Sequence, residues 1–228
     1  MPGMAPDSPE IPDLRKWRLP RGRHGLPREL IARSQRERLL AAVVRTTAAN
    51  GCEATTVADI LEEAGVGRES FYELFEDRQD CMLSAHRVLT DDLAERVEAA
   101  YLGEGAWAER LRAALDAALR WFAADPAAAR FVLIDLAPLG TPFRARFHDE
   151  FRRFLSLLGE GPEGPPRAQA PRAGILALSA AVAGIHEEVA HGRTERLPEK
   201  LPQLLYEVLV PFLGEAGAQR ERQRAEAG

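Results

Sequence analysis

The chain has 228 residues, a hydrophobic fraction of 46% and a net charge of −5, which is typical of a globular protein with one core or with two joined domains. Its two cysteines exclude a disulfide framework. The longest nearly apolar stretch, 174–185, has 12 residues. This stretch is too short for a membrane span of about 20 residues and predicts a buried helix.

Charge is distributed unevenly along the chain. Residues 14–38 hold nine Lys and Arg against two acidic residues, whereas residues 39–80 hold three against nine. Positive charge therefore gathers in one short arm and at the start of the first expected helix. The beginning of the chain lacks the apolar core of a signal peptide, so we expect a cytoplasmic protein and no membrane partner.

Apolar residues recur at spacings of three and four along nearly the whole chain, which predicts an all-α fold. We expect four parts: a disordered basic arm at 1–26, a three-helix domain at 27–76, a helical bundle at 77–214 and a flexible tail at 215–228. Gly, Pro and Asp breaks predict helices at 27–50, 57–64, 68–75, 78–102, 105–124, 126–137, 142–158, 172–191 and 198–214.

The segment 56–75 meets the requirements of a helix-turn-helix motif. Thr56 and Asp59 form a capping-box pattern before a short helix, and Gly65 suits a turn that needs a positive φ. Phe71 and Phe75, four residues apart, turn to the inner face of the next helix. The outer face, where DNA would lie, then carries Arg68, Glu69, Tyr72 and Glu73.

Four runs in this segment resemble the TetR family of regulators: Thr55–Ile60, Ala64–Arg68, Ser70–Phe75 and Asp77–Asp80. The resemblance implies a homodimer whose third helices enter adjacent major grooves of a palindromic double-stranded operator. It also implies that Thr56, Tyr72 and Arg78 contact phosphate, and that Gly67, Arg68, Ser70 and Glu73 approach bases.

Two residues depart from the family pattern. Gly67 stands where a helix-capping Ser is usual, so a side-chain contact is lost there. Glu73 stands where a neutral or basic residue is common, and an acidic side chain beside phosphate is unfavourable unless it accepts a hydrogen bond from cytosine.

The arm contains Pro20–His24, which resembles the core of AT-hook peptides. Arg21 and Arg23 flank a glycine and are suited to a narrow minor groove, which predicts A/T-rich flanks beside the operator. The alternative is a solvated charged leader. The sequence also leaves open whether the basic residues near the start of the first helix contact phosphate or form a solvated face, and we expect a phosphate contact from one of Arg33, Arg36 and Arg38.

The bundle is rich in aromatic residues, and Phe143, Phe147, Phe151 and Phe154 form a stripe on one helix. Most of these side chains must be core, but their density also allows an apolar ligand cavity with a few polar groups. The predicted ligand-binding residues, with two histidines as polar groups, are Trp107, Trp121, Phe131, Phe147, His148, Phe151 and His186.

The last two expected helices carry small and apolar residues suited to close helix packing. In TetR-like proteins the corresponding helices pair with their copies across a two-fold axis. The alternative is packing within one protomer only. The residues predicted at the dimer interface are Ala180, Ala183, Gly184, Leu205, Val208, Leu209 and Phe212.

Other chemistry is not indicated. His186 and His191 are five residues apart, whereas a zinc-protease helix needs a spacing of four. Cys52 and Cys81 occupy apolar positions and are expected to be buried structural thiols. The sequence has no phosphate-binding glycine loop and no nucleophile elbow. We therefore expect no catalytic site, metal or cofactor, and no enzymatic activity.

The function predicted from these patterns is a ligand-responsive, sequence-specific transcriptional regulator. The family's commonest behaviour implies a repressor, released from its operator when a small apolar or amphipathic effector shifts the fourth helix. The alternative is a helical adaptor that binds protein and has kept the fold without specific DNA binding. The acidic segment 39–80 and Glu73 favour that alternative.

Overall fold

The computed structural model of the chain describes residues 28–158 and 170–227. Every regular element in these two ranges is helical and no strand occurs in them, which confirms the predicted all-α fold. In chain order the elements are α1 (Arg28–Asn50), α2 (Val57–Ala64), α3 (Arg68–Leu74), α4 (Arg78–Tyr101), α5 (Trp107–Ala124), α6 (Pro126–Arg130), the π-helix η2 (Phe131–Asp135), the 3-10 helix η3 (Ala137–Leu139), α7 (Thr141–Leu158), α8 (Ala170–Ala190), the 3-10 helix η4 (Thr194–Lys200) and α9 (Leu201–Ala227).

Local signals explain how α2 and α3 begin and end. The Thr56 hydroxyl accepts a hydrogen bond from the Asp59 amide at 3.2 Å, and the Asp59 carboxylate accepts one from the Thr56 amide at 2.8 Å. This reciprocal pair is the predicted capping box. Gly65 ends α2 with a φ of 60°, a left-handed conformation that favours glycine. Gly67 precedes α3 and supplies no side-chain cap, as expected.

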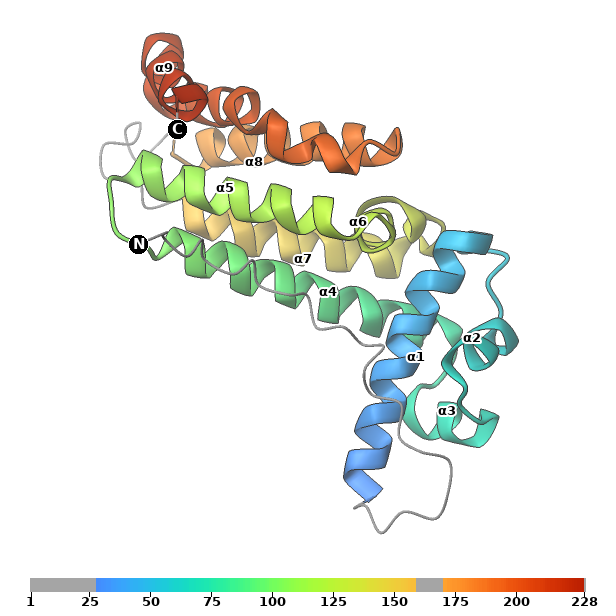
Figure 1. The fold of residues 1–228 in the computed structure, drawn as a ribbon. Helices are drawn as coiled ribbons and strands as arrows, with labels where there is room; N and C mark the ends of the chain where they lie inside the picture. Colours follow the sequence, from blue (N-terminus) through green and yellow to red (C-terminus); the bar gives the residue numbers. More distant parts are fainter. Residues whose placement is uncertain (1–27, 159–169, 228) are drawn as a thin grey trace, which may run out of the picture.

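Two clusters of buried side chains organise the fold. The head cluster joins α1, α2 and α3 around Leu39, Ile60 and Phe71, each 0% exposed, and it includes Phe131 and Phe143 from beyond α4. The bundle cluster is formed mainly by α4, α5, α8 and α9. Figure 1 shows the head, α1–α3, at one end of α4, with α5 and α7 running beside α4 and with α8 and α9 beyond them.

The segment after α5 differs from the single helix predicted at 126–137. Asp125 caps the short α6, and the backbone then widens into the π-helical turn η2. Arg130 and Asp135 are five residues apart and form an ion pair of 2.9 Å across this turn. Five residues is the hydrogen-bond spacing of a π-helix. Apolar residues that recur every 3.6 positions predict an α-helix and give no signal for a π-helical turn.

The C-terminal residues 215–227 are also helical, rather than the flexible tail predicted. Gly214 has a φ of 66° and introduces a kink, after which α9 continues to Ala227. Ala218 is 0% exposed and belongs to the bundle cluster. Small side chains after the kink therefore let the helix pack on the bundle instead of fraying.

One face of α8 is buried, in agreement with the predicted buried helix. Ala177 and Ile185 belong to the bundle cluster, and Gly184 lies so close to Leu204 of α9 that a Cβ would require the Leu204 side chain to move. By length and composition alone, the segment 172–190 would also suit a membrane span, with a mean hydropathy of 1.3. Core helices of globular proteins meet the same criterion, and here the helix is packed against its neighbours.

Arg78 fixes the start of α4 to the head. Its Nη1 donates to the carbonyl oxygens of Cys52 and Thr55 at 2.6 Å each, and it lies 3.3 Å from the carbonyl of Glu53. These carbonyls belong to the loop between α1 and α2. A single guanidinium therefore holds this loop against α4.

His86 lies where α4 passes from the head cluster to the bundle cluster. The side chain is 1% exposed, its Nε2 lies 3.2 Å from the Val132 carbonyl in η2, and its ring meets Phe143 edge-on at 5.4 Å. Burial lowers the pKa of His86 to about 4, the bond to Val132 opposes this change, and the charge of Arg146 adds to it. A neutral ring that donates through Nε2 thus links α4 to η2.

Replacing Arg78 with Ala should lower the free energy of unfolding by about 1–3 kcal/mol, because the loop carbonyls lose a charged donor. Chemical denaturation measures this change. The matched control is Arg33→Ala, since the Arg33 side chain is 78% exposed and, among residues 28–158 and 170–227, pairs only with Glu37 on the same helix. That variant should lose about 0.5 kcal/mol or less. Equal stabilities for the two variants would contradict the anchoring role of Arg78.

Acid should destabilise the protein partly through His86. Its pKa is about 4 in the folded state against an ordinary 6.5, so the unfolded chain takes up the proton first as the pH falls. The stabilisation is complete above about pH 6.5 and should be lost between pH 6.5 and 4, by about 3 kcal/mol. Unfolding measured across this range should show this loss in the wild type and not in His86→Leu. Parallel pH profiles would refute the assignment.

Candidate functional site

The outer face of α3 is exposed and is the candidate DNA-reading surface. Arg68, Tyr72 and Glu73 are exposed on it, with Tyr72 52% exposed. On the opposite face Phe71 and Phe75 are buried in the head cluster, as the four-residue spacing predicted. Packing of these two rings therefore sets the orientation in which α3 presents its polar side chains.

Other residues predicted to contact DNA lie around this face. Thr56 and Gly67 are exposed at the starts of α2 and α3, while Ser70 is half-buried and its hydroxyl accepts a hydrogen bond from Gln35 of α1 at 3.3 Å. Arg78 is half-buried and its Nη1 is bound to the loop carbonyls, so the structure gives it an internal role instead of a free phosphate-binding one. The predicted minor-groove residues Arg21 and Arg23 lie outside the described residues.

The three arginines near the start of α1 have different surroundings. Arg38 donates from Nη1 to the Ala64 carbonyl at 3.2 Å, at the C-terminal end of α2. The guanidinium of Arg36 stacks over the ring of Phe75 at 5.0 Å. Within the described part of the chain, Arg33 forms only the surface pair with Glu37. Arg36 and Arg38 thus stabilise the head, and Arg33 is the most accessible of the three for phosphate.

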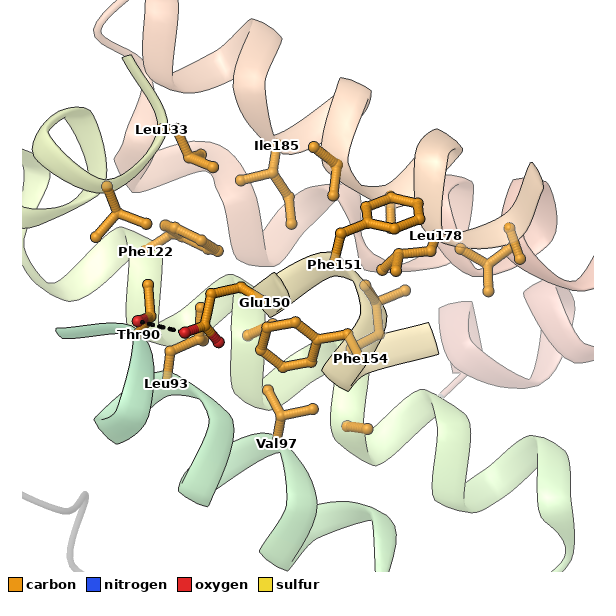
Figure 2. Close-up of a pocket in the computed structure, with 18 of the residues that line it drawn as sticks. Thr90, Leu93, Val97, Phe122, Leu133, Glu150, Phe151, Phe154, Leu178 and Ile185 are labelled. Carbon is orange, nitrogen blue, oxygen red and sulfur yellow. Dashed lines mark hydrogen bonds between the residues drawn. The ribbon is translucent and has the colours of Figure 1, made fainter. Parts of the chain in front are cut away.

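A second candidate site is a cavity of about 150 Å³ inside the bundle (Figure 2). Its walls come from α4, α5, α7 and α8, with further residues from η2 and α9. The residues lining it are His86, Thr90, Leu93, Val97, Tyr101, Leu111, Ala114, Leu115, Ala118, Phe122, Val132, Leu133, Phe147, Glu150, Phe151, Phe154, Ala177, Leu178, Ala181, Val182, Ile185 and Val208.

Four of these side chains bring polar atoms to an otherwise apolar wall: His86, Thr90, Tyr101 and Glu150. The Thr90 hydroxyl lies 3.2 Å from Glu150 Oε1, the contact drawn in Figure 2. Three buried atoms, His86 Nδ1, Tyr101 Oη and Glu150 Oε2, have no hydrogen-bond partner among the described residues. Unpaired polar atoms beside an apolar space are typical of a ligand site.

The predicted ligand-binding residues are only partly brought together. Phe147 and Phe151 line the cavity. Three of the others are buried elsewhere: Trp107 packs on Phe212 at 5.0 Å, Trp121 donates to Asp92 at 2.6 Å, and Phe131 belongs to the head cluster.

The two histidines predicted as polar groups, His148 and His186, are exposed and do not line the cavity. On α7 the actual polar residue is Glu150, which follows Phe147 by three positions and precedes Phe154 by four. The sequence signal that could have identified this polar residue of the cavity wall was an acidic residue within the aromatic stripe. Because successive residues of a helix are turned by about 100°, His148 projects away from the face that carries Phe147.

Three of the four dimer residues predicted on α9 need correction. Leu205, Val208 and Leu209 are at most 3% exposed and lie in the protomer's own bundle cluster. Phe212 packs on Trp107 but is only half-buried, so its place at a dimer interface stays a prediction. On α8, Gly184 packs against Leu204 within the protomer, Ala180 is half-buried and Ala183 is exposed. The apolar periodicity of both helices is used mainly inside one chain. The exposed apolar side of α8 instead carries Ile175 and Leu176, 45% and 62% exposed.

The two thiols are buried and free, as predicted. Burial raises the pKa of Cys81 to about 12, and burial likewise raises that of Cys52 against the opposing charge of Arg78. Thiols with raised pKa values are poor nucleophiles and poor metal ligands. In residues 28–158 and 170–227, no group of three or more His, Cys, Asp or Glu side chains is placed to hold a metal ion.

Comparison with known proteins matches the head to a family. Residues 39–85 match the model of bacterial regulatory proteins of the tetR family. No curated protein sequence is detectably similar to the chain.

Several solved structures share the fold at low sequence identity. The fatty acid degradation regulator FadR from Bacillus halodurans is 16% identical, with a TM-score of 0.70 over 77% of this chain and 94% of that one. FadR from Bacillus subtilis, solved in complex with stearoyl-CoA, is 17% identical, with a TM-score of 0.69 over 78% and 97%. A tetR-family regulatory protein from Rhodococcus RHA1 is 18% identical, with a TM-score of 0.62 over 76% and 96%.

These neighbours establish that the bundle continues the same fold beyond the matched head. The head carries the exposed α3 face and the helix-turn-helix geometry described above. Residues 39–85 are thus similar to the tetR-family model, and the described chain as a whole shares the fold of solved tetR-family regulators.

Proposed function

We propose that the protein is a homodimeric repressor that binds a palindromic operator through α3 and is released by a small apolar or amphipathic effector. The observation that carries this proposal is the double role of α4. Its first half packs in the head cluster through Cys81 and Met82, and its second half lines the cavity through Leu93 and Val97. Any ligand that moves this helix also moves the head.

Contacts around α4 support such coupling. Phe147 of α7 lines the cavity and packs against the head cluster, and Leu89 of α4 packs against both clusters. His86 lines the same cavity and bonds to η2. A ligand that displaces Phe147 would therefore disturb side chains that support the head. An effector needs to prefer the non-binding conformation by only a few kcal/mol.

The cavity supports an apolar or amphipathic effector because aromatic and aliphatic side chains form most of its wall. The B. subtilis protein of the same fold was solved with stearoyl-CoA, a molecule with a long apolar chain. This relative supports the same broad class of ligand here without identifying it.

A second copy of the chain is the expected partner of the outer face of α8. Ile175 and Leu176 lie exposed on that face, and the exposed Ala183 follows Leu176 by about two helical turns. A two-fold axis would bring this face against its own copy and would remove the exposed apolar surface from water. Two heads in one dimer would then read two half-sites of the operator about 34–36 Å apart.

The rival function is a protein-binding adaptor. It is favoured by acidic residues on the exposed face of α3, where Glu69 and Glu73 accompany Arg68. Negatively charged side chains repel phosphate and weaken DNA binding. Selection of bound duplexes from a random DNA pool separates the two functions.

Selection from a random pool of DNA duplexes should enrich a palindromic core with the full-length protein and with a 27–228 truncation. A/T-rich flanks should be enriched only by the full-length chain, because Arg21 and Arg23 are absent from the truncation. Arg68→Ala should abolish or relax the core preference at one position per half-site, by about 1–3 kcal/mol. Arg120→Ala, which removes an exposed arginine from α5 in the bundle, is the control and should select the same core as the wild type.

Failure of every variant to enrich a core, across salt concentrations and effector candidates, would favour the adaptor. Enrichment of the core with flanks of random composition would instead leave the head as the DNA reader and refute the role of the arm.

Leu176→Glu should convert the dimer into monomers, because a charge cannot be buried without a partner in an apolar interface. Sedimentation velocity measures the change, and operator affinity should fall in the same variant because the two half-sites are no longer read together. Leu102→Glu is the matched control, since Leu102 is 77% exposed just after the end of α4. An unchanged sedimentation coefficient for Leu176→Glu would exclude this face as the interface.

A further inference from the structure

Glu150 is the unusual member of the cavity wall. Among the described residues that line the cavity it supplies the only carboxylate, and no Lys or Arg lines the cavity with it. Figure 2 shows its side chain among Phe154, Leu93 and Phe122. The helical repeat of α7 explains this position. Glu150 follows Phe147 by three residues and precedes Phe154 by four, so all three side chains lie on the same inward face of the helix.

The carboxylate is short of hydrogen-bond donors. Thr90 has one hydroxyl proton, and two acceptors compete for it: Glu150 Oε1 at 3.2 Å and the Arg87 carbonyl at 3.1 Å. Glu150 Oε2 is buried and has no partner among residues 28–158 and 170–227. A carboxylate normally accepts several hydrogen bonds, so this one keeps capacity for a donor that the described residues do not supply.

Arg153, whose charge acts on Glu150, does not supply that donor. Arg153 lies three residues further along α7, but its Nε donates to Glu98 at 2.8 Å and its Nη1 to Asp91 at 3.2 Å. Both partners are on α4. Arg153 therefore acts on Glu150 only through its charge, and its own donors hold α7 against α4.

We propose that the effector is an amphiphile whose polar end donates a hydrogen bond to Glu150 Oε2, as a hydroxyl or a protonated amine does, and whose apolar body lies along the aromatic wall. The proposal rests on the proposed effector-binding function and names its ligand class. A buried acceptor without a donor is costly, so a ligand that supplies one gains affinity. A ligand with a carboxylate at this end would place two acceptors together and bind more weakly.

Three probes with the same ten-carbon chain test the proposal: decylamine, 1-decanol and decanoate. Titration calorimetry at pH 7 with the full-length protein should give tighter binding for decylamine and decanol than for decanoate, by about tenfold or more. Glu150→Gln should reduce this preference about tenfold, because the amide replaces one acceptor oxygen with a donor. Glu150→Met provides a second replacement of similar length and should reduce the preference in the same direction.

The matched control is Glu98→Gln, which removes a carboxylate on α4 that pairs with Arg153 and does not line the cavity. It should keep the wild-type preference. Equal affinity of the wild type for decanoate and decylamine would overturn the proposal, as would binding of none of the probes or an unchanged preference in both Glu150 variants. Operator binding measured in the same samples without probe tests the regulator function separately, because it does not depend on which probe binds.

Discussion

The packing of α4 into two separate hydrophobic clusters is the constraint on which the rest of the structure depends. Its 24 residues span about 36 Å as one regular helix. Side chains near its start, including Cys81 and Met82, are 0% exposed in the head cluster, and Leu93 and Val97 are buried in the bundle cluster. A regular helix can transmit a rotation along its length, so α4 provides a direct physical connection between the two clusters.

The second wall of the cavity is formed by α7. α7 reaches the head cluster through Phe143 and the cavity through Phe151 and Phe154. Polar contacts link α7 to α4 at two places. Arg153 forms partly exposed ion pairs with Asp91 and Glu98, and Glu150 accepts a hydrogen bond from the Thr90 hydroxyl. Exposed ion pairs contribute little stability. The cavity thus lies between α4, which is buried in both clusters, and α7, which Phe143 anchors in the head cluster and Arg153 ties to α4.

Local features of the structure could be predicted from the sequence, whereas the surroundings into which several side chains point could not. The capping box at Thr56 and the glycine turn at Gly65 depend on neighbouring residues, and both were predicted. Leu205 was predicted at a dimer interface, although it is buried within the protomer. Apolar periodicity shows that a face will be covered, but it does not distinguish a covering helix of the same chain from one of a second chain.

The candidate site shows the same limit at the level of single residues. The aromatic stripe of α7 was visible in the sequence, but the polar group on its inner face was assigned to His148 instead of Glu150. Histidine was chosen as a common polar residue of ligand sites, but the spacing along the helix places Glu150, and not His148, on the inner face. Arg78 is a related case: its position matched a phosphate-contacting residue, yet the loop carbonyls around it take up its Nη1. That contact depends on tertiary structure and has no local signal.

The internal use of arginine in the head has a consequence for DNA binding. Arg36, Arg38 and Arg78 make stacking or backbone contacts inside the head, and Arg45 pairs with Glu63. Few cations therefore remain on a surface that also carries the acidic side chains of α3. Residues 14–26 hold five Lys and Arg and no acidic residue. Phosphate neutralisation supplies much of the affinity of DNA-binding proteins, so the proposed DNA-binding function requires cations from outside the head, and the sequence offers them in residues 14–26.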